Sequence, residues 1–311
     1  MNSIPYGRQS IDQDDINAVV STLQSDYLTQ GPKVKEFEDK FAEYVGAKYA
    51  VAVNNATSGL HLAVLSLGLK KGERVITTPI TFAASANCIR YAGGEVWFAD
   101  IDESSYLLSL ENTRKLIESK PKGFFKGIIP VDFAGLPLDL EAFRELANEH
   151  GLWIIEDACH APGGYFNDSK GLKNFCGNGN YADIGVFSFH PVKHIACGEG
   201  GMLTTNNPEL ANIARRFTSL GYAGVSGKQA KITRRDIQDP NYNRHISVGY
   251  NYRMSEVQSA VMLGQLERIK ELVDIRIKVG EIFDEAIEGS HIVTKQHNKT
   301  QNNIVTYEIT I

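Results

Sequence analysis

The stretch at residues 49–69, YAVAVNNATSGLHLAVLSLGL, decides the fold class of this chain. Its first part, Tyr49–Val53, is a short apolar run that predicts a buried strand. The rest, from Asn54 onward, predicts a turn followed by a helix. A strand, a short turn and a helix in direct succession form the repeating unit of an α/β fold, so this stretch favours that class.

The same alternation continues on both sides of this stretch, from about residue 34 to residue 206. Further buried strands are predicted at Arg74–Thr77, Glu95–Phe98, Gly127–Val131, Leu152–Ile155, Ile184–Phe189 and Gly201–Thr205. Helices are predicted at Val34–Val45, Leu140–His150 and Glu209–Leu220. Short, nearly continuous apolar strands separated by helices are typical of parallel sheets. The sequence therefore predicts an α/β fold with a mostly parallel central sheet and helices on both faces.

The remainder of the chain carries a different pattern. The polar segment Lys228–Arg244 contains charges of both signs, which predicts an exposed loop. Ser255–Ile287 has the pattern of one long helix, in which Gly264 and Gly280 are candidate bends. The tail at residues 291–311 ends in a strand-like run, IVTYEITI.

Composition narrows the classes of function. The chain has 311 residues, of which 42% are hydrophobic and 22% are charged, so it can bury a substantial core. Its net charge of −5 disfavours a nucleic-acid-binding protein, because such proteins are usually basic. No apolar run approaches the ~20 residues of a membrane span, and the N-terminal residues lack the pattern of a secretory signal. The four cysteines are scattered, which favours reduced thiols in a cytoplasmic protein.

The strongest chemical signal is the stretch at residues 188–201, SFHPVKHIACGEGG. Lys193 stands in a tight, mostly apolar turn directly after a predicted strand, and a glycine-rich stretch follows it. A lysine that is partly withdrawn from water loses its proton more readily, and a neutral amine is what Schiff-base chemistry requires. The residues by themselves leave a second interpretation open, in which Lys193 is an ordinary surface lysine of a turn.

Two other strand ends carry polar groups. Thr57 and Ser58 open the helix after the first strand, where backbone N–H groups and two hydroxyls could bind an anion. A plain helix cap formed by these hydroxyls is the alternative. Asp157 and His160 follow the apolar strand at Leu152–Ile155, at the end where ligands of open α/β sheets bind. A carboxylate there could pair with the ring nitrogen of pyridoxal phosphate (PLP), although a structural aspartate and a structural histidine suit the same pattern.

An aromatic side chain follows a third strand, in the sequence TPITFAASA at residues 78–86. Phe82 could stack on a flat cofactor ring, and packing into the core is the alternative. Each of these signals is modest by itself, and their order along the chain is more specific.

That order resembles the sugar-nucleotide aminotransferases, a branch of the fold-type I PLP enzymes. From the N-terminus come a phosphate cradle, an aromatic residue, an aspartate at a strand end, a Ser–x4–Lys pair, and then GYNYRMSE at residues 249–256. The resemblance extends over about residues 4 to 285. It implies PLP as the cofactor, transamination as the reaction, and the fold of a fold-type I PLP-dependent transferase.

The resemblance also implies a role for each matching residue. The residues that match cofactor-binding positions of the family are Thr57, Ser58, Phe82, Asp157, His160, Ser188, Lys193 and Asn251. Lys193 would bond to the cofactor and move the proton of the reaction, and Asp157 would pair with the ring nitrogen. His160 would lie near the ring hydroxyl, Phe82 against the ring face, and the three hydroxyl residues around the phosphate. Asn251 would reach the phosphate of the neighbouring subunit's cofactor, which implies a homodimer with shared active sites.

The N-terminal motifs narrow the expected substrate. IPYGRQSI at residues 4–11 and LTQGP at 28–32, together with SFHPVKHI and EDACHA, resemble the branch of the family that acts in pseudaminic acid biosynthesis. This implies amination at C4 of a nucleotide-linked 4-keto-6-deoxy sugar, UDP-2-acetamido-2,6-dideoxy-β-L-arabino-hexos-4-ulose, with L-glutamate as the donor. The residues that match segments lining the sugar-nucleotide pocket are Tyr6, Asp26, Tyr27, Leu28 and Thr29.

The resemblance implies a chain of three parts. These are an N-terminal arm at residues 1–33, a large PLP-binding domain at 34–255, and a long helix with the start of a small C-terminal domain at 256–311. Members of the family extend beyond the point at which this chain stops, so the small domain is expected to be incomplete. Cofactor binding is then expected to be retained and sugar-nucleotide turnover to be weakened or lost.

Four other interpretations compete with this one. The spacing of His190, His194 and Cys197 could ligate zinc in a helix, but Pro191 argues against a helix and no fourth ligand is evident, so no metal is expected. The chain could be a non-catalytic PLP-binding protein, or an aminotransferase for another UDP-, dTDP- or GDP-linked keto-sugar. A nucleic-acid-binding regulator is disfavoured by the acidic charge balance.

Overall fold

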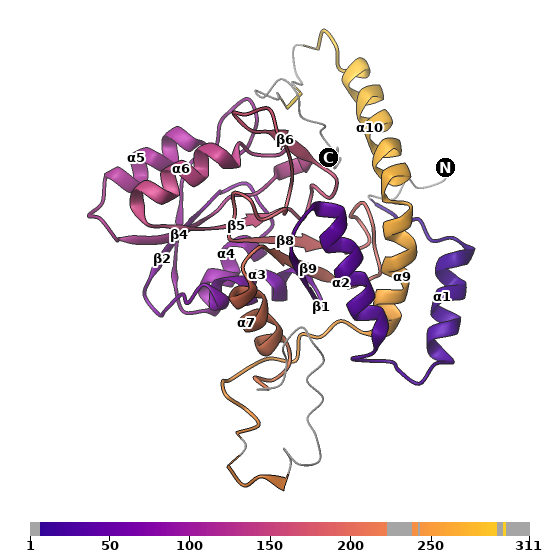
Figure 1. The fold of residues 1–311 in the computed structure, drawn as a ribbon. Coiled ribbons are helices and arrows are strands. Elements are labelled where there is room, and N and C mark those ends of the chain that lie inside the picture. Colours follow the sequence, from indigo (N-terminus) through magenta and orange to yellow (C-terminus); the bar gives the residue numbers. More distant parts are fainter. Residues whose placement is uncertain (1–6, 223–237, 242, 291–294, 297–311) are drawn as a thin grey trace.

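The computed structural model describes residues 7–222, 238–241, 243–290 and 295–296, and a seven-stranded sheet forms its centre (Figure 1). The strands stand in the order β1 (Tyr49–Val53), β9 (Gly201–Thr205), β8 (Ile184–Ser188), β5 (Trp153–Asp157), β4 (Phe125–Ile129), β2 (Arg74–Thr77) and β3 (Glu95–Phe98). β9 is antiparallel to both of its neighbours, and all other strand pairs of this sheet are parallel. The prediction of an α/β fold with a mostly parallel sheet is confirmed. Since β1 and β8 both run opposite to β9, the C-terminal ends of every strand except β9 lie at one edge.

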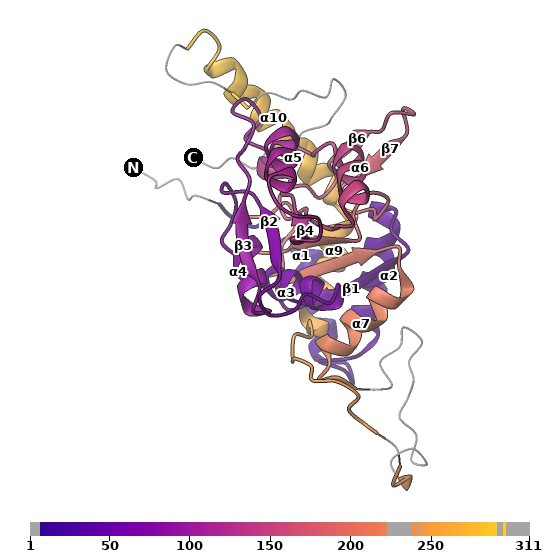
Figure 2. The same cartoon turned by 90° about the vertical axis from the view of Figure 1, so that its left-hand side faces the viewer.

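Helices cover both faces of the sheet, as predicted (Figures 1 and 2). One face is packed by α2 (Pro32–Val45), α5 (Leu110–Glu118), α6 (Leu140–His150), α9 (Glu256–Glu267) and α10 (Ile269–Ala286), and the other by α3 (Ala56–Ser66), α4 (Ala84–Tyr91) and α7 (Pro208–Thr218). Successive side chains of a strand point to opposite faces. Ala52 and Val53 of β1 therefore belong to different cores, as do Ile154 and Ile155 of β5.

The packing of α2 shows how local sequence builds one of these layers. Pro32 occupies the first helical position, where its missing N–H costs nothing. Phe37 and Phe41 lie one turn apart and are fully buried. Their rings contact Phe187 and Phe189 edge-on, with centroids 4.9 to 5.5 Å apart. Burying each ring stabilises the layer by about 1.5–3 kcal/mol.

The single long helix predicted near the C-terminus is wrong, because α9 and α10 are two helices that meet at Arg268. Gly264 and Gly280 lie inside these helices and do not interrupt them. A Cβ added to Gly264 would stand 2.5 Å from Asp15 Oδ1 of α1 (Gln13–Leu23), so this glycine permits close helix packing instead. Arg268 at the break forms an ion pair with Asp15 at 2.7 Å, which ties α1 to the junction.

The other elements are largely confirmed, with boundary shifts of one or two residues. β4 starts and ends two residues before the predicted strand, and α7 ends at Thr218 instead of Leu220. β5 continues two residues past Ile155, because Glu156 and Asp157 still pair with β8 although they are not apolar. The sequence patterns did not predict α1, α4, α5, or the hairpin of β6 (Tyr165–Asn167) and β7 (Lys173–Phe175). The predicted loop at 228–244 lies mostly outside the described residues, and the strand-like run IVTYEITI lies entirely outside them.

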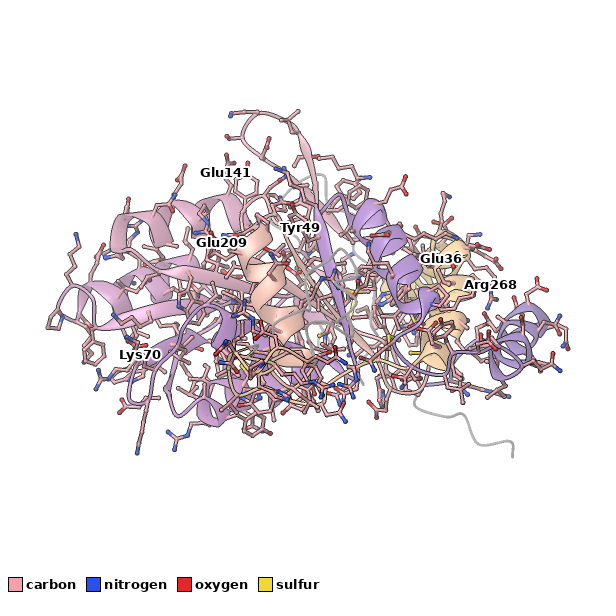
Figure 3. The ribbon with its side chains drawn as sticks, turned by 60° about the horizontal axis from the view of Figure 1, so that its bottom comes forward. Glu36, Tyr49, Lys70, Glu141, Glu209 and Arg268 are labelled. Atoms are coloured by element: carbon pink, nitrogen blue, oxygen red, sulfur yellow. The ribbon has the colours of Figure 1, made fainter. Side chains whose placement is uncertain are left out.

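Charged side chains cover the outer surface of the layers. Lys70 and Glu209, which are labelled in Figure 3, are exposed examples. Within the described part of the chain, no helix combines the length and the apolar composition that crossing a membrane requires.

Candidate active site

Predicted site residues gather at the edge where the parallel strands end. Thr57 and Ser58 open α3 directly after β1, and Asp157 is the last residue of β5. Ser188 is the last residue of β8, and Lys193 stands in the turn that follows it. The fold therefore assembles one site from segments that are distant in sequence.

Asp157 is held by hydrogen bonds and is only 4% exposed. Its Oδ2 accepts a hydrogen bond from Ser85 Oγ at 2.7 Å, and Ser85 Oγ also lies 2.7 Å from Thr81 Oγ1. Its Oδ1 accepts a bond from the N–H of Cys159 at 3.3 Å. A carboxylate fixed in this way presents its negative charge in one position, at the end of the strands.

His160 and Lys193 are electrostatic neighbours. Burial, and to a smaller extent the charge of Lys193, lowers the pKa of His160 to about 3. The ring is therefore neutral at pH 7, and its Nδ1 accepts a bond from the N–H of Ala134 at 3.3 Å. With Nδ1 as the acceptor, Nε2 carries the proton and is left as the donor of the ring.

The turn that carries Lys193 is fixed from behind by the C-terminal helices. Arg276 of α10 donates hydrogen bonds to the carbonyl oxygens of Val192 at 3.0 Å and of Lys193 at 2.8 Å. Gln265 of α9 accepts a bond from the N–H of Ala196 at 3.3 Å. Lys193 itself is half-buried.

The turn between β1 and α3 forms a helix N-terminus that is open to an anion. The cap of α3 is Asn55, whose side chain accepts the N–H of Ser58 at 2.8 Å, so the alternative of a Thr57 or Ser58 cap is wrong. A Cβ added to Gly201 of β9 would stand 2.6 Å from the carbonyl carbon of Asn55. Only glycine allows this close approach, which fixes the position of the turn. Helix N-termini of this kind bind phosphate groups.

Phe82 and Asn251 are both exposed near this edge. Phe82 is 71% exposed, so the alternative that it packs into the core is wrong. Asn251 lies on a segment that pairs with Ser219, and the carbonyl of the next residue, Tyr252, accepts the N–H of Asn54 at 2.8 Å. Asn251 therefore lies beside the turn between β1 and α3.

A family model matches nearly the whole chain. The model of the DegT/DnrJ/EryC1/StrS aminotransferase family matches residues 9–311. The chain belongs to this family. It is accordingly a PLP-dependent sugar aminotransferase with the α/β fold of that group.

Individual members of the family resemble the chain over most of its length. The UDP-4-amino-4,6-dideoxy-N-acetyl-beta-L-altrosamine transaminase of Campylobacter jejuni is 35% identical over 305 residues, which are 97% of this chain and 75% of that protein. The spore coat polysaccharide biosynthesis protein SpsC of Bacillus subtilis is 36% identical over 285 residues, or 92% of this chain and 69% of SpsC. Among solved structures, Helicobacter pylori PseC, an aminotransferase involved in the biosynthesis of pseudoaminic acid, has a TM-score of 0.80 at 29% identity and covers 93% of this chain and 72% of its own.

The described residues of this aminotransferase suit PLP. The buried carboxylate of Asp157 can accept from a protonated ring nitrogen, and the neutral His160 can donate to a ring hydroxyl. The exposed ring of Phe82 and the N-terminus of α3 are available to an aromatic ring and a phosphate group. The role of each residue in cofactor binding stays a prediction.

The predicted sugar-nucleotide segment is anchored next to the site. Tyr6 lies outside the described residues, and those that the structure describes are all exposed: Asp26, Tyr27, Leu28 and Thr29. The carbonyl of Leu28 accepts the N–H of Glu256 at 3.1 Å, and Thr29 pairs with Ser255. Residues 251–256 therefore connect the turn between β1 and α3 to this segment.

Sequence reasoning missed two residues of this aminotransferase that hold others in place. Ser85, which bonds to Asp157, lies in the same TPITFAASA stretch as Phe82, and a hydroxyl one helical turn after the aromatic residue was an available signal. Glu256 accepts the N–H groups of Gly31 and Lys33, each at 2.8 Å, at the start of α2. No local pattern marks Glu256, because its partners are more than 200 positions away in the sequence.

The zinc alternative finds no support in the structure. His190 is exposed and His194 is buried, and they do not form a metal-binding group with Cys197. Among the described residues, one cluster has ligand atoms close enough to hold a metal, and its members are Asp132, Glu156 and Cys176.

Proposed function

We propose that this aminotransferase transfers the amino group of L-glutamate to C4 of UDP-2-acetamido-2,6-dideoxy-β-L-arabino-hexos-4-ulose. The observation that carries the proposal is that Lys193 is close enough to His160 to lower the pKa of His160, at the edge of the sheet where Asp157 ends β5. The choice of substrate is supported by 35% identity to the Campylobacter jejuni transaminase over 97% of the chain.

Three residues prepare the ring of the cofactor in this proposal. When bound, PLP supplies the electron-accepting ring that amino-group transfer requires. The carboxylate of Asp157, held by Ser85, keeps a proton on the ring nitrogen. Nε2 of the neutral His160 would donate to the ring hydroxyl, and the exposed Phe82 would cover the ring face.

A second group of residues would hold the phosphate group of the cofactor. These are the hydroxyls of Thr57, Ser58 and Ser188, to which the N-terminus of α3 would add the positive end of a helix dipole. The contact of Gly201 with Asn55 sets the depth of this cradle.

Lys193 is the residue that bonds to the cofactor and moves the proton at the substrate carbon. Arg276 fixes the backbone of its turn by bonding to the carbonyls of Val192 and Lys193. The long side chain can then change partners while its attachment point stays in place, which a residue serving twice in one reaction needs.

We also infer that two copies of the chain form the working enzyme. Ile246 and Val248 are 46% and 85% exposed and lie on the segment that leads to Asn251. The backbone of this segment is held by Gly221, because the N–H of Ile246 donates to the carbonyl of Gly221 at 3.0 Å. Exposed apolar side chains next to a site favour a protein partner. A second copy would cover them and bring its own Asn251 to the phosphate.

The sugar nucleotide is placed along the segment before α2. Tyr27 and Leu28 are 54% and 52% exposed and offer the aromatic and apolar surface on which a base or a sugar ring packs. Glu256 and Ser255 hold the backbone of this segment.

The test is a spectroscopic series on the full chain purified with PLP. We expect bound PLP to give a visible absorbance band, and reduction with borohydride to attach the cofactor irreversibly to Lys193. In unreduced protein, L-glutamate should bleach the band and the UDP-linked 4-keto sugar should restore it. Lys193→Ala is expected to abolish covalent fixation, while the matched control Lys170→Ala, at an exposed position, leaves it unchanged.

Each step can contradict a different part of the proposal. Fixation on scattered lysines would remove Lys193 from its role. Failure of glutamate to bleach the band would remove the donor, and no restoration by any sugar nucleotide would favour a non-catalytic PLP-binding protein. Restoration by a different UDP-, dTDP- or GDP-linked keto-sugar would replace the substrate, and the 36% identity to SpsC is the reason to include such sugars.

A further inference from the structure

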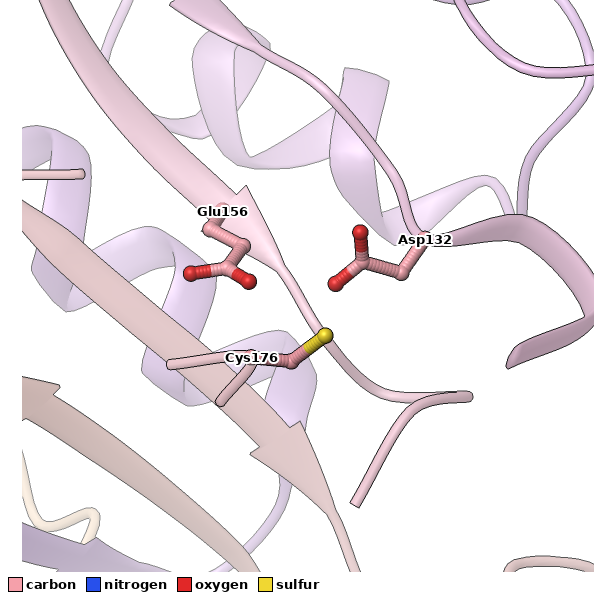
Figure 4. A group of neighbouring side chains, drawn as sticks. All are labelled: Asp132, Glu156 and Cys176. Carbon is pink, nitrogen blue, oxygen red and sulfur yellow. The ribbon is translucent and has the colours of Figure 1, made fainter. Parts of the chain in front are cut away.

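Two carboxyl groups and a thiol meet in the protein interior (Figure 4). They belong to Asp132, after β4, to Glu156 of β5, and to Cys176, after β7, which are 0%, 1% and 2% exposed. One oxygen or sulfur atom of each lies within 4.8 Å of the others. None of these three residues has a part in the proposed reaction.

The hydrogen bonds of the two carboxyl groups are incomplete if both are ionised. Asp132 Oδ1 accepts the N–H of Leu138 at 3.1 Å, and Glu156 Oε2 accepts the N–H of Gly177 at 2.9 Å. The other two oxygens, Asp132 Oδ2 and Glu156 Oε1, are buried and accept no hydrogen bond from a nitrogen or an oxygen, and the neutral thiol of Cys176 faces both carboxyl groups as a weak donor. A single proton between them would supply the missing donor and remove one of two adjacent buried charges.

The pKa values of the two carboxyl groups also favour a proton between them. Burial raises the pKa of Asp132 to about 7, and burial and Asp132 together raise the pKa of Glu156 well above its usual range. Two other titratable groups face the pair. The carboxylate of Asp157 raises the pKa of Asp132, and the thiol of Cys176 stays neutral because burial and both carboxyl groups raise its own pKa.

Backbone hydrogen bonds connect the pair to Asp157. The N–H of Asp132 donates to the carbonyl of Asp157 at 3.1 Å, and the N–H of Asp157 donates to the carbonyl of Pro130 at 2.9 Å. Glu156 directly precedes Asp157 in β5. A hydrogen bond between the side chains of Asp132 and Glu156 would therefore join the ends of β4 and β5 a second time, beside the backbone bonds of Asp157.

We propose that Asp132 and Glu156 share one proton and act as a pair of positioning residues that hold Asp157 in the site. The shared proton does not depend on the proposed function of the protein, whereas the importance of Asp157 to the cofactor does. The pair touches neither substrate nor cofactor, and it acts through the backbone of Asp157.

The proton is tested first, on the chain without cofactor. Asp132→Asn is the matched variant, because its oxygen can still accept from Leu138 and its NH2 group can donate to Glu156 where the proton stood. Asp139→Asn is the control: it also removes one carboxylate, but at the cap of α6, where asparagine serves as well as aspartate. Urea unfolding is measured from pH 4 to pH 8.

The sign of the expected change follows from linkage. The pKa values of both carboxyl groups are raised in the folded protein, that of Asp132 from 3.8 to about 7 and that of Glu156 well above its usual 4.5, so the folded pair keeps a proton that the unfolded chain releases. This stabilisation is complete below pH 3.8 and is lost as the pH rises through 7 and above. Relative to Asp132→Asn, the unfolding constant of the unmutated chain should rise about 10³-fold across this window. Asp139→Asn should follow the unmutated chain.

The same experiment can overturn the shared proton. A constant difference between Asp132→Asn and the unmutated chain at every pH would mean that no proton is held. Stoichiometric metal in the purified chain, with a loss of stability on adding EDTA, would mean that a cation and not a proton joins the carboxylates.

The positioning role is tested by adding PLP. Asp132→Asn should keep the cofactor's absorbance band and its pH dependence, because the bond to Glu156 survives. Asp132→Ala removes that bond and should shift the pH at which the absorbance band changes, and it should also weaken PLP binding. If the alanine variant does not fold, Asp132→Ser is used in its place. An unchanged spectral titration in the alanine or serine variant would overturn the positioning role. If the unmutated chain shows no PLP band, the proposed function fails, while the unfolding measurements still decide the shared proton.

Discussion

Glu256→Gln should destabilise this protein far more than the loss of one surface charge would. The Glu256 carboxylate is 1% exposed and accepts three backbone N–H groups at the start of α2, from Gly31 at 2.8 Å, Lys33 at 2.8 Å and Val34 at 3.3 Å. Gly31 is required there, since an added Cβ would stand 2.7 Å from Glu256 Oε2. The contact replaces the cap that α2 lacks in its own sequence.

The magnitude follows from which oxygen each N–H uses. Oε1 accepts from Gly31 and Val34, and a glutamine oxygen can keep both bonds. Oε2 accepts from Lys33, and a glutamine NH2 group at that position would face a second donor. One buried charge-assisted bond is lost, about 1.5–3 kcal/mol, and the interaction of the charge with the helix dipole is lost as well, about 0.3–1 kcal/mol. We expect Glu256→Gln to lower the free energy of unfolding by about 2–4 kcal/mol.

Urea unfolding at pH 7 measures this, with Glu267→Gln in the same helix as the control. Glu267 is 70% exposed and pairs with Lys40 at 3.5 Å, so its loss should cost less than about 1 kcal/mol. The variant should also weaken binding of the UDP-sugar, because Glu256 anchors the segment that contains Leu28, while bleaching by glutamate stays unchanged. Equal unfolding free energies for Glu256→Gln and Glu267→Gln would show that the buried carboxylate does not stabilise the start of α2.

Three further outcomes are expected. His160→Gln should make the protein less sensitive to acid: the pKa of His160 is lowered to about 3, so its contribution to stability falls by about 1.4 kcal/mol per unit as the pH drops below 6.5, and glutamine has no such dependence. Ser85→Ala removes the 2.7 Å bond to buried Asp157 and should lower the free energy of unfolding by about 1.5–3 kcal/mol in urea. Gly201→Ala places a methyl group 2.6 Å from the carbonyl carbon of Asn55 and should weaken PLP binding, measured by titration of the absorbance band.

Each of these predictions has a matched control. His150→Gln, in the last turn of α6, should keep the acid sensitivity of the unmutated chain, and identical acid unfolding of the His160 variant would contradict the first prediction. Ser119→Ala removes an exposed hydroxyl bond and should cost little, so a Ser85 variant of the same stability would contradict the second. Gly46→Ala adds a methyl group that meets nothing within 4 Å and should leave PLP affinity unchanged despite its φ of 79°. Equal affinities for the two glycine variants would contradict the third.

The strands and most of the helices could be predicted from local sequence, because their formation depends on the pattern of neighbouring residues. Apolar runs such as Tyr49–Val53 are buried wherever the chain places them, so the strands of the sheet were predictable, and Asn54 onward already contained the turn and helix that follow. Because strands of one direction end at one edge, the order of the elements along the chain is enough to assign Lys193 and Asp157 to a common site. The boundary of β5 was missed because Glu156 and Asp157 pair with β8 despite their charge. The division into an arm at 1–33, a large domain at 34–255 and a C-terminal part from 256 stays a prediction.

Tertiary structure alone decided which groups hold the site in place. Ser85 bonds to Asp157 across 72 positions and Glu256 to Gly31 across 225, and no periodicity reports a contact of that range. Arg268 at the break pairs with the carboxylate of Asp15 on another helix, and a helical pattern that runs through Arg268 could not show this contact. The sequence by itself determined that this chain builds an α/β sheet with a lysine and an aspartate at one edge. Their orientation, and the partners that restrain them, follow from side chains that become neighbours only when the sheet and its helices pack.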